Sequence, residues 1–386
     1  MDNYSVTHVL KNDLGGITSL IRNLIEYRGT GALPQKIILL RIAGNPFATF
    51  DGNLIDGVET SFFDFNKRNN WYHSFNKLRE CIGNEKGVLI SNDTYDLLML
   101  SYYNIPKKVI QIVHDAYNVK LSIKFEAVID QFICHSYFYF EVLRQLLPER
   151  RGEIHFISYG IPILKNPEER MLNDQLKLVF VGRHDKAKGI YDLFEINKVL
   201  KENNVAAKWL ILGRGPETES VKQQWAAENN IDFYTAKSSE EIIELCMQQD
   251  IMVFPTKFEG FPVAMVEAMS VGCVPVVSDL PGGIRELGSK ENAIICEFDN
   301  NHAFAEGIMK LNKDRTTLKQ MSNNCIDYIS ARHDAVKQSI KYQQFFKEVA
   351  LSDREPRHHR VKNKLGSRLD QVYIPNGITS FLRRNF

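Results

Sequence analysis

Short apolar runs alternate with amphipathic stretches along most of the chain. The runs have the length of buried strands and fall at residues 4–10, 36–42, 87–91, 108–113, 131–134, 154–157, 176–181, 209–212, 231–234, 251–254 and 274–277. Several stretches between them, such as 17–27, 136–151 and 238–249, repeat their apolar positions with the spacing of a helix. Alternation of this kind predicts an α/β fold, with parallel sheets covered by helices on both faces.

The pattern is interrupted at residues 159–170, where two prolines and several polar residues replace the apolar periodicity. A chain of 386 residues is also too long for a single hydrophobic core. We therefore predict two domains, residues 1–164 and 165–333, with 159–170 as the linker between them. A helix at 334–350 and a tail at 351–386 follow the second domain.

The most informative stretch, residues 251–278, reads as strand, loop, helix and strand. Its loop carries Glu259, Gly260 and Phe261 directly after an apolar run. Pro262 then stands where the first helical residue would be, because proline lacks the N–H that a helix start leaves unpaired. In open parallel sheets, ligands bind at the carboxyl ends of the strands, and a helix start there attracts an anion such as phosphate.

The helix of this unit is expected at residues 263–271, with Gly272 as its C-terminal stop, and it carries Glu267. Glu259 in the loop and Glu267 on the helix can face the same crevice. A carboxylate accepts hydrogen bonds in pairs, which suits neighbouring sugar hydroxyls. The alternative is that both are solvated surface acids. The surrounding strand, loop and proline-started helix favour the binding role.

Two cations, Arg183 and Lys188, follow Gly182 at the end of another strand-like run. They can converge on a diphosphate, the arginine through two hydrogen bonds and the lysine as a point charge. The alternative is a solvated basic loop. Phosphate binding is favoured because the next strand also ends in a glycine turn, Gly213-Arg214-Gly215-Pro216.

The first half of the chain carries two weaker signals. Gly15 and Gly16 lie between the first strand and the first helix, where glycine lets the backbone approach a phosphate. Glycine at this place can also serve tight packing alone. His114 and Asp115 directly follow the run 108–113 and thus lie at another strand's carboxyl end. A lone histidine there is either structural or a ligand contact.

Composition excludes several classes of function. The formal net charge of +1 argues against a partner nucleic acid bound by bulk charge. Neither a bilayer-spanning apolar run nor a secretory signal is present, so we expect a cytoplasmic protein. The six cysteines are scattered without a CxxC pair, which is typical of small buried side chains in a reducing compartment. The sequence has neither histidines and cysteines at metal-ligand spacing nor a DxD-like motif at the end of a strand. It therefore does not indicate a bound metal.

These motifs resemble the retaining glycosyltransferases of family 4. The resemblance is strong from about residue 176 to 311 and continues, more weakly, through the N-terminal half. It rests on Gly182-Arg183 with Lys188-Gly189, on the turn at 212–216, on Glu259-Gly260-Phe261-Pro262 with Glu267, and on Gly15-Gly16, His114 and the stretch 157–161. It implies the GT-B fold, in which two Rossmann-like domains face each other across a cleft. The acceptor would bind domain 1–164 and the nucleotide-sugar domain 165–333, and the helix at 334–350 would cross back to the first domain.

The resemblance also implies roles for the charged residues. Arg183 and Lys188 match the pair that neutralises the donor diphosphate. Glu267 matches the acid that binds the ribose hydroxyls, and Glu259 matches the acid that contacts the donor sugar in the catalytic centre.

Other matched positions are backbone or sugar contacts. The backbone at Gly260, Phe261, Pro262 and Val263 matches the loop that holds sugar and phosphate. Gly16, next to Gly15, matches a glycine that lies against the diphosphate, and His114 matches a histidine that reaches the transferred sugar. The remaining matched residues belong to the turns near the phosphates and the nucleotide base: Gly182, Gly213, Gly215 and Pro216.

The implied chemistry needs no metal and no other cofactor, because the nucleotide-sugar is a substrate. Departure of the leaving group places negative charge on the diphosphate, and fixed cations with a helix start would stabilise it. Retention in such enzymes is thought to proceed on one face of the sugar, with the leaving phosphate helping to deprotonate the acceptor. Glu259 is therefore not assigned as a nucleophile.

The tail at 351–386 holds eight Lys or Arg against three Asp or Glu and ends in the sequence FLRRNF. Charge together with buried apolar residues can hold such a segment on an anionic membrane surface, giving a peripheral protein on the inner face. The alternative is a solvated or subunit-packing tail.

The sequence thus predicts a retaining glycosyltransferase that moves a sugar from a UDP- or GDP-sugar to a glycan or glycolipid acceptor. Surface polysaccharide, lipid-linked oligosaccharide or lipopolysaccharide synthesis is the expected setting. Two alternatives stay open: a non-catalytic GT-B subunit that supports a partner transferase, and a GT-B sugar-nucleotide epimerase. A dinucleotide oxidoreductase is disfavoured, because no complete GxGxxG follows a strand.

Overall fold

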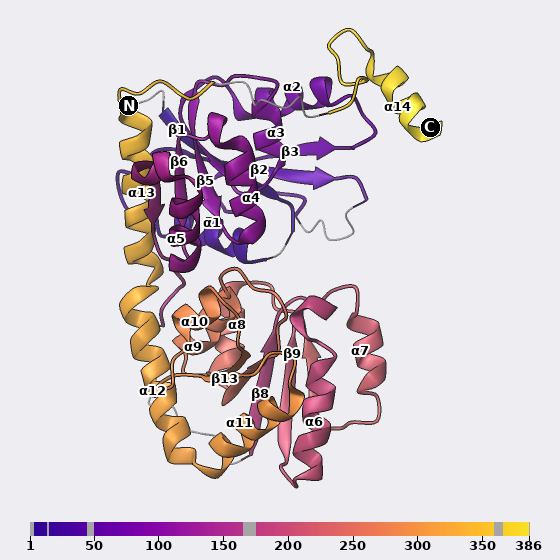
Figure 1. Cartoon of the computed structure of the whole chain (residues 1–386), viewed down its shortest axis with the longest axis vertical. Coiled ribbons are helices and arrows are strands. Elements are labelled where there is room, and N and C mark those ends of the chain that lie inside the picture. Colours follow the sequence, from indigo (N-terminus) through magenta and orange to yellow (C-terminus); the bar gives the residue numbers. More distant parts are fainter. Residues whose placement is uncertain (1–3, 14, 45–49, 165–174, 359–365, 386) are drawn as a thin grey trace. The chain divides into compact units, whose positions relative to one another are not determined.

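The computed structural model describes residues 4–13, 15–44, 50–164, 175–358 and 366–385, which form two compact units (Figure 1). The N-terminal unit comprises Met1–His135, Tyr139–Ile157 and Val336–Phe386. The C-terminal unit comprises Ser136–Phe138 and Ser158–Ala335.

The N-terminal unit is built on a seven-stranded parallel sheet in the order β3-β2-β1-β4-β5-β6-β7. Its strands are β1 (Tyr4–Lys11), β2 (Gln35–Ile42), β3 (Glu59–Phe65), β4 (Lys86–Ser91), β5 (Lys107–Val113), β6 (Gln131–Cys134) and β7 (Ile154–Phe156). Its helices are α1 (Gly16–Glu26), α2 (Trp71–Ile82), α3 (Tyr95–Leu100), α4 (Ala116–Phe125), η1 (Glu126–Val128), α5 (Tyr137–Leu146), η2 (Pro148–Glu153), α13 (Ala335–Leu351) and α14 (Asn376–Asn385). All seven residues of β5 are buried, as expected for a strand covered on both faces.

The C-terminal unit repeats this architecture with six parallel strands in the order β10-β9-β8-β11-β12-β13. Its strands are β8 (Leu176–Val181), β9 (Ala207–Leu212), β10 (Ile231–Tyr234), β11 (Ile251–Phe254), β12 (Val274–Ser278) and β13 (Ile294–Cys296). Its helices are η3 (Lys186–Lys188), α6 (Asp192–Glu202), α7 (Thr218–Gln224), α8 (Ser239–Met247), α9 (Val263–Ser270), α10 (Gly283–Leu287), α11 (Asn301–Lys313) and α12 (Arg315–Arg332).

Both units show the strand order of doubly wound Rossmann-like folds, which confirms the predicted α/β class. In this topology the order reverses between the first and the fourth strand, here between β1 and β4 and between β8 and β11. Ligands of such sheets bind at the carboxyl ends of the strands beside this reversal, called the switch point. The loops that follow β1, β4, β8 and β11 are therefore the places to search for function.

Helix α13 follows the C-terminal unit in sequence but belongs to the N-terminal unit, as predicted for the crossing helix (Figure 1). Its buried residues recur at helix spacing and include Ser339, Tyr342 and Phe346. The Ser339 hydroxyl donates to the Leu24 carbonyl at 2.7 Å. At the helix end, the Lys108 ammonium donates to the Val349 carbonyl at 2.9 Å, where a cation also meets the negative end of the helix dipole.

The described part of the tail packs on helix α2. The Asn70 side chain caps α2 and donates to the Gln371 carbonyl at 2.9 Å. The Trp71 N–H donates to the Asp370 carboxylate at 2.7 Å, and Arg383 pairs with the same carboxylate at 2.6 Å. These polar groups of the tail are therefore used in packing on α2, and the choice between membrane docking and a solvated or subunit-packing tail stays open. Residues 359–365 of the tail lie outside the described residues.

The predicted linker at 159–170 differs from the structure in its first residues. Tyr159 and Ile161 are 1% and 0% exposed, and the Ile161 N–H donates to the His333 carbonyl at 2.8 Å. These residues pack within the C-terminal unit, because Tyr159 and Ile161 supply apolar side chains that the prolines obscured in the sequence pattern. Residues 165–170 lie outside the described residues.

Three other expectations need correction. Strands β3 and β13, at sheet edges, were not predicted. The helix expected at 136–151 ends at Leu146, because Pro148 cannot continue it and begins the separate helix η2. Pro262 has φ −80° and ψ 81° and is the residue before α9 rather than its first helical residue.

All six cysteines remain thiols, and five of them are buried, in agreement with their predicted packing role. Across the described residues, the helices are too short or too polar to traverse a bilayer.

Candidate functional site

The two predicted cations of the loop after β8, Arg183 and Lys188, form ion pairs with different residues. Asp185 caps η3 by accepting from the Lys188 N–H at 3.0 Å, and it also forms an ion pair with Arg183. The Arg183 side chain remains 63% exposed. Gly189 ends η3 with φ +69°, and an added Cβ would lie 2.0 Å from the Pro255 carbonyl oxygen. Glycine is required there by the backbone itself, which brings the loop after β8 against the segment after β11.

Lys188 and Glu259 meet at the switch point of the C-terminal unit. Lys188 follows β8 and Glu259 follows β11, and these strands are neighbours. The Lys188 ammonium donates to Glu259 Oε1 at 2.5 Å and to the Phe258 carbonyl at 3.1 Å. An ammonium has three N–H donors, and the described residues provide these two oxygen acceptors. One donor is thus available to an oxygen atom of a ligand.

The loop between β11 and α9 is held by the start of α10. Gly283 donates its N–H to the Gly260 carbonyl at 3.2 Å. A Cβ at Gly283 would lie 2.5 Å from the Pro262 side chain, so this close packing needs glycine. No described side chain caps α9, whereas Ser238 caps α8 by accepting from the Glu241 N–H. The start of α9 is instead closed by the backbone, since the Val263 N–H donates to the Phe261 carbonyl at 3.0 Å and the Met265 N–H donates to the Pro262 carbonyl at 2.9 Å.

Glu267 lies on α9 and is 3% exposed. Its carboxylate accepts a hydrogen bond from the Ser239 hydroxyl at the start of α8. Burial raises the pKa of Glu267 to about 7, and the charge of Glu240 adds to this effect, whereas the Ser239 hydrogen bond opposes it. Glu267 is therefore poised between its two protonation states at neutral pH.

The glycine turn after β9 packs backbone to backbone on the loop after β8. Gly213 has φ +128°, and a Cβ there would lie 2.0 Å from the Gly182 carbonyl oxygen. A Cβ at Gly215 would lie 2.4 Å from the His184 carbonyl oxygen. Pro216 completes the turn, and the buried His184 ring bonds Thr218 at 3.0 Å. Close backbone packing thus requires glycine at positions 213 and 215. Their role near the nucleotide stays a prediction.

In the N-terminal unit, His114 lies at the carboxyl end of β5, as predicted. Its Nε2 is 3.0 Å from Asn92 Oδ1, and its Nδ1 is 3.0 Å from His135 Nε2. Burial lowers the pKa of His114 well below its ordinary value, and the neighbouring His135 lowers it further. The adjacent Asp115 caps α4 by accepting from the Tyr117 and Asn118 N–H groups. Asp115 therefore serves the helix start, and His114 is a neutral ring between two polar neighbours.

Gly15 and Gly16 stand at the start of α1, beside the switch point of the N-terminal unit. Gly15 has φ 176°, an extended conformation that any residue adopts, and no described atom lies within 4 Å of a Cβ built on it. No side chain caps α1. Unlike Gly189 or Gly213, Gly15 has no steric reason to be glycine among the described residues, which fits a backbone left open to a ligand.

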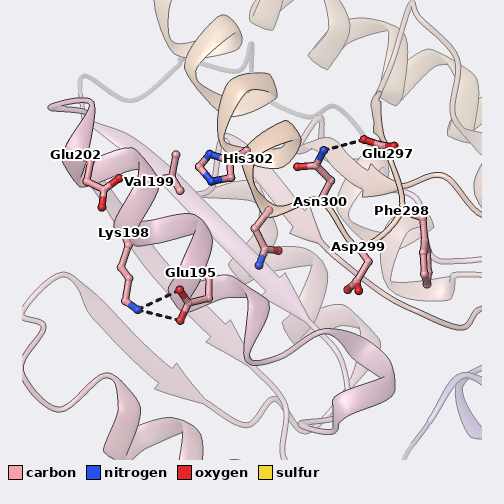
Figure 2. Close-up of a pocket in the computed structure, with 10 residues that line it drawn as sticks. Glu195, Lys198, Val199, Glu202, Glu297, Phe298, Asp299, Asn300 and His302 are labelled. Atoms are coloured by element: carbon pink, nitrogen blue, oxygen red, sulfur yellow. Dashed lines mark hydrogen bonds and ion pairs between the residues drawn. The ribbon is translucent and has the colours of Figure 1, made fainter.

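A separate surface pocket lies between α6 and the start of α11 (Figure 2). None of the residues predicted from the sequence lines it. Within it, the Lys198 ammonium donates to Glu195 at 3.0 Å and the Asn300 amide donates to Glu297 at 2.8 Å, whereas Asp299 pairs with Lys257, which does not line the pocket. Elsewhere in the described chain, no cluster of three or more His, Cys, Asp or Glu side chains could hold a metal ion.

The structure thus brings Lys188 and Glu259 into contact and places Glu267 on the helix that follows. Arg183 lies in the same loop as Lys188 but bonds Asp185. Sequence reasoning missed Ser239, His135 and Asn92. His135 could have been found, because it directly follows the run 131–134 just as His114 follows 108–113. Ser239 could not, because its partner is distant in sequence.

Comparison with known proteins relates part of the chain to a described family. Residues 164–328 match the family described as glycosyl transferases group 1, which covers less than half of the chain. The chain is 35% identical over 121 residues to the putative colanic acid biosynthesis glycosyltransferase WcaL of Escherichia coli K12, covering 29% of this chain and 30% of that protein. It is 24% identical over 165 residues to a GDP-mannose:cellobiosyl-diphosphopolyprenol alpha-mannosyltransferase of Xanthomonas oryzae, covering 42% of this chain and 43% of that one. The matched stretches thus span less than half of these relatives.

Solved structures resemble the whole chain more closely in fold than in sequence. HepE from Anabaena, solved with UDP and glucose, has a TM-score of 0.72 at 15% identity and covers 89% of this chain. A sucrose-phosphate synthase from Thermosynechococcus elongatus has a TM-score of 0.71 at 14% identity and covers 90%. This likeness confirms the predicted GT-B fold with its two Rossmann-like domains. The family match, at residues 164–328, falls in the C-terminal unit.

Proposed function

We propose that this protein is a retaining glycosyltransferase of the family 4 type. It would transfer a sugar from a UDP- or GDP-sugar to a glycan acceptor in surface polysaccharide, lipid-linked oligosaccharide or lipopolysaccharide synthesis. The observation that carries this proposal is the pair Lys188 and Glu259, which joins two loops at the switch point of the unit that matches the glycosyltransferase family.

The donor diphosphate would bind between the start of α9 and the cations of the β8 loop. Lys188 has one N–H donor left for a phosphate oxygen, and the exposed Arg183 can turn from Asp185 to a phosphate. Negative charge that develops on the leaving diphosphate would meet both cations and the positive end of α9. In this arrangement the fixed cations supply the stabilisation that a divalent ion supplies elsewhere, so we propose that no metal takes part.

The two glutamates would read the sugars of the donor. Glu267, hydrogen-bonded to Ser239, is suited to accept hydrogen bonds from the ribose hydroxyls. Glu259 is held in place by Lys188 and would contact the transferred sugar, with Gly260, Phe261, Pro262 and Val263 supplying the surrounding backbone. For His114, Gly15 and Gly16 of the N-terminal unit, a sugar contact and a phosphate contact stay predictions.

The names of two relatives support the proposed class of acceptor. WcaL is named for colanic acid biosynthesis, and the Xanthomonas enzyme for transfer to a diphosphopolyprenol-linked sugar. We extend this to a lipid-linked or polysaccharide acceptor here. A supporting subunit without activity and a sugar-nucleotide epimerase are the alternatives. The first would have no use for the paired Lys188 and Glu259, and the second would need no acceptor.

The test is release of nucleoside diphosphate from a panel of UDP-, GDP- and ADP-sugars, without and with lipid-linked acceptors. Slow release from one donor, lost in Arg183→Ala and Glu267→Ala, would support the proposal. Glu244→Ala, an exposed acid on α8, is the matched control and should keep the activity. Donor binding without release under any acceptor would favour the supporting subunit, and conversion of the donor sugar without release would favour the epimerase.

We also propose that the tail docks on an anionic membrane surface. Val372, Tyr373, Ile378 and Phe381 are 57%, 77%, 53% and 63% exposed, and Arg384 is exposed on the same helix as Phe381. Apolar side chains beside a cation suit the headgroup region of acidic lipids. Co-sedimentation with phosphatidylglycerol vesicles should fall in Ile378→Ser/Phe381→Ser and in high salt, but not in Ile123→Ser on α4. Equal binding by all three proteins would contradict the docking role.

A further inference from the structure

Ser239 connects two neighbouring helices of the C-terminal unit. It is the first residue of α8, which packs against α9, and its hydroxyl donates to Oε1 of Glu267 on α9. Ser239 and Glu267 are 4% and 3% exposed, so this hydrogen bond lies in the interior of the unit. A donor that faces a buried carboxyl group favours its charged form, because the carboxylate only accepts hydrogen bonds.

The start of α8 does not need the Ser239 hydroxyl. The preceding residue, Ser238, caps the helix by accepting from the Glu241 N–H at 3.2 Å. The two adjacent serines thus have different partners: Ser238 bonds the backbone of its own helix, and Ser239 bonds a carboxylate on the next helix. Replacement of Ser239 by alanine should therefore leave the helix cap in place.

The two oxygens of the Glu267 carboxylate differ in their use. Oε1 accepts from Ser239, whereas Oε2 accepts no hydrogen bond from the residues that the structure describes. Each carboxylate oxygen can accept more than one hydrogen bond. One oxygen is therefore held inside the protein, and the other is left for the hydroxyl groups of a ligand.

The charge state of Glu267 depends on few neighbours. Burial raises its pKa to about 7 and the charge of Glu240 on α8 adds to this effect, whereas the Ser239 hydrogen bond lowers the pKa. Helix α9 also packs against β12 and α12. Strand β12 carries no titratable side chain, and the thiol of Cys325 on the buried face of α12 donates to the Asn292 carbonyl at 3.1 Å. Among the described residues, no cation forms an ion pair with Glu267, so Ser239 is the group that opposes burial.

We propose that Ser239 is a positioning residue that keeps the Glu267 carboxyl group available in its ionised form, and that binding of a nucleotide-sugar releases a proton from this group to the solvent. This inference rests on the proposed function, in which ribose hydroxyls donate to Glu267. Each such hydrogen bond favours the carboxylate, as the bond from Ser239 does. The O–H bond of the protonated carboxyl group breaks, and the proton passes to the buffer. Affinity for the nucleotide-sugar should therefore rise as the pH passes through about 7 and level off above it.

A carboxyl titration without ligand tests the role of Ser239. In NMR spectra of protein with ¹³C-labelled glutamate, the Glu267 signal is the one that Glu267→Gln removes. It should titrate at a higher pH in Ser239→Ala than in the wild type, and Ser239→Thr, which keeps a hydroxyl, should restore the titration. Ser270→Ala is the matched control, because this buried hydroxyl donates to the main-chain carbonyl of Glu267 at 2.7 Å and not to its carboxylate. The same titration in folded Ser239→Ala as in the wild type would overturn the proposal.

Calorimetric titration with UDP-glucose, GDP-mannose and ADP-glucose tests the release of the proton. The phosphates of these conjugates do not titrate near neutral pH, so a difference between two buffers of unlike ionisation enthalpy counts protons from the protein. The wild type should release protons at pH 7, and Glu267→Gln should release none. Ser239→Ala should bind about 5-fold more weakly than the wild type at pH 7 and nearly equally at about pH 9, because the higher pH ionises its Glu267.

The two measurements separate this inference from the proposed function. A loss of affinity in Ser239→Ala that is the same at both pH values would mean a merely structural role and would overturn the proposal. Equal proton release by the wild type and Glu267→Gln would overturn it as well. If none of the three conjugates binds the folded wild type, the proposed function fails together with the proton release, whereas the carboxyl titration still decides whether Ser239 sets the charge of Glu267.

Discussion

The two units have the same strand order but different chemistry where that order reverses. In the C-terminal unit, Lys188 and Glu259 form an ion pair between two loops. In the N-terminal unit, Asn92, His114 and His135 are neutral and largely buried. A charged edge suits the diphosphate end of a substrate, and a neutral hydrogen-bonding edge suits uncharged hydroxyls. One architecture thus offers two kinds of recognition, decided by a few residues at strand ends.

The largest effect is expected from Lys188→Ala, which removes a cation from the charged edge. Turnover of the donor should fall about 10²–10³-fold, because the leaving diphosphate loses a fixed charge. Lys257→Ala is the control, since Lys257 lies in the neighbouring loop but pairs with Asp299 at 2.5 Å. Nucleoside diphosphate release measures both variants. Equal losses in the two would mean that Lys188 acts through general loop stability.

The next effect concerns stability and pH. The pKa of Glu267 is raised from 4.5 to about 7, so folding favours its protonated form. The stability that this form contributes is complete below pH 4.5 and is lost as the pH rises through about 7, a change of about 3 kcal/mol. The Glu267→Gln side chain cannot titrate. Its free energy of unfolding should therefore rise relative to that of the wild type as the pH increases over this range. Denaturant unfolding at several pH values measures the difference, and a pH-independent difference would refute the assignment.

Substitution of one glycine in each unit should affect stability differently. Gly213→Ala should destabilise the protein by about 1–3 kcal/mol, because its φ of +128° disfavours a side chain and the new Cβ would meet the Gly182 carbonyl. Gly15→Ala should leave the melting temperature unchanged, since its backbone is extended and uncrowded among the described residues. If Gly15 approaches a phosphate, this second variant should instead lose donor turnover. A large fall in its melting temperature would contradict the open backbone.

The smallest effect is expected at the end of the crossing helix. Lys108→Met removes the ammonium that donates to the Val349 carbonyl and the Ser352 carbonyl at 2.9 and 2.6 Å. The loss should be about 1 kcal/mol, the usual value for a cation at a helix end. Hydrogen exchange should quicken in the last turn of α13 but not in α1. Lys120→Met on α4 is the control, and faster exchange in both variants would argue against a capping role.

Much of the fold was readable because most strands of a doubly wound sheet are continuous apolar runs. The two missed strands are edge strands: β3 contains Glu59 and Asp64, and β13 has only three residues, so neither gives a clear run. The helix predicted at 136–151 extends past Pro148, because the amphipathic pattern continues beyond this proline. Local sequence thus fixed element type better than element ends.

The sequence could predict candidate site residues only where they lie close together along the chain, in one loop or one helix. Glu259 and Glu267 are close in sequence, and their pattern pointed to one crevice. The partners of these residues were not visible, because Lys188 is paired with Glu259 by the neighbouring strands β8 and β11, and Ser239 reaches Glu267 from another helix. The contact of His135 with Tyr342 depends on a helix more than two hundred residues away along the chain. Such pairs are decided by sheet order and packing, which no local pattern contains.

We propose that the charged edge of the C-terminal unit binds a nucleotide-sugar. Calorimetric titration of the protein with UDP, GDP and ADP and with their sugar conjugates tests it most directly. We predict that one nucleoside diphosphate binds with a stoichiometry of one, and that Glu267→Gln weakens this binding about 10- to 100-fold, as expected for a lost hydrogen bond to a charged group. Absence of binding by every nucleotide to the folded wild type, or equal binding by the variant, would contradict the claim.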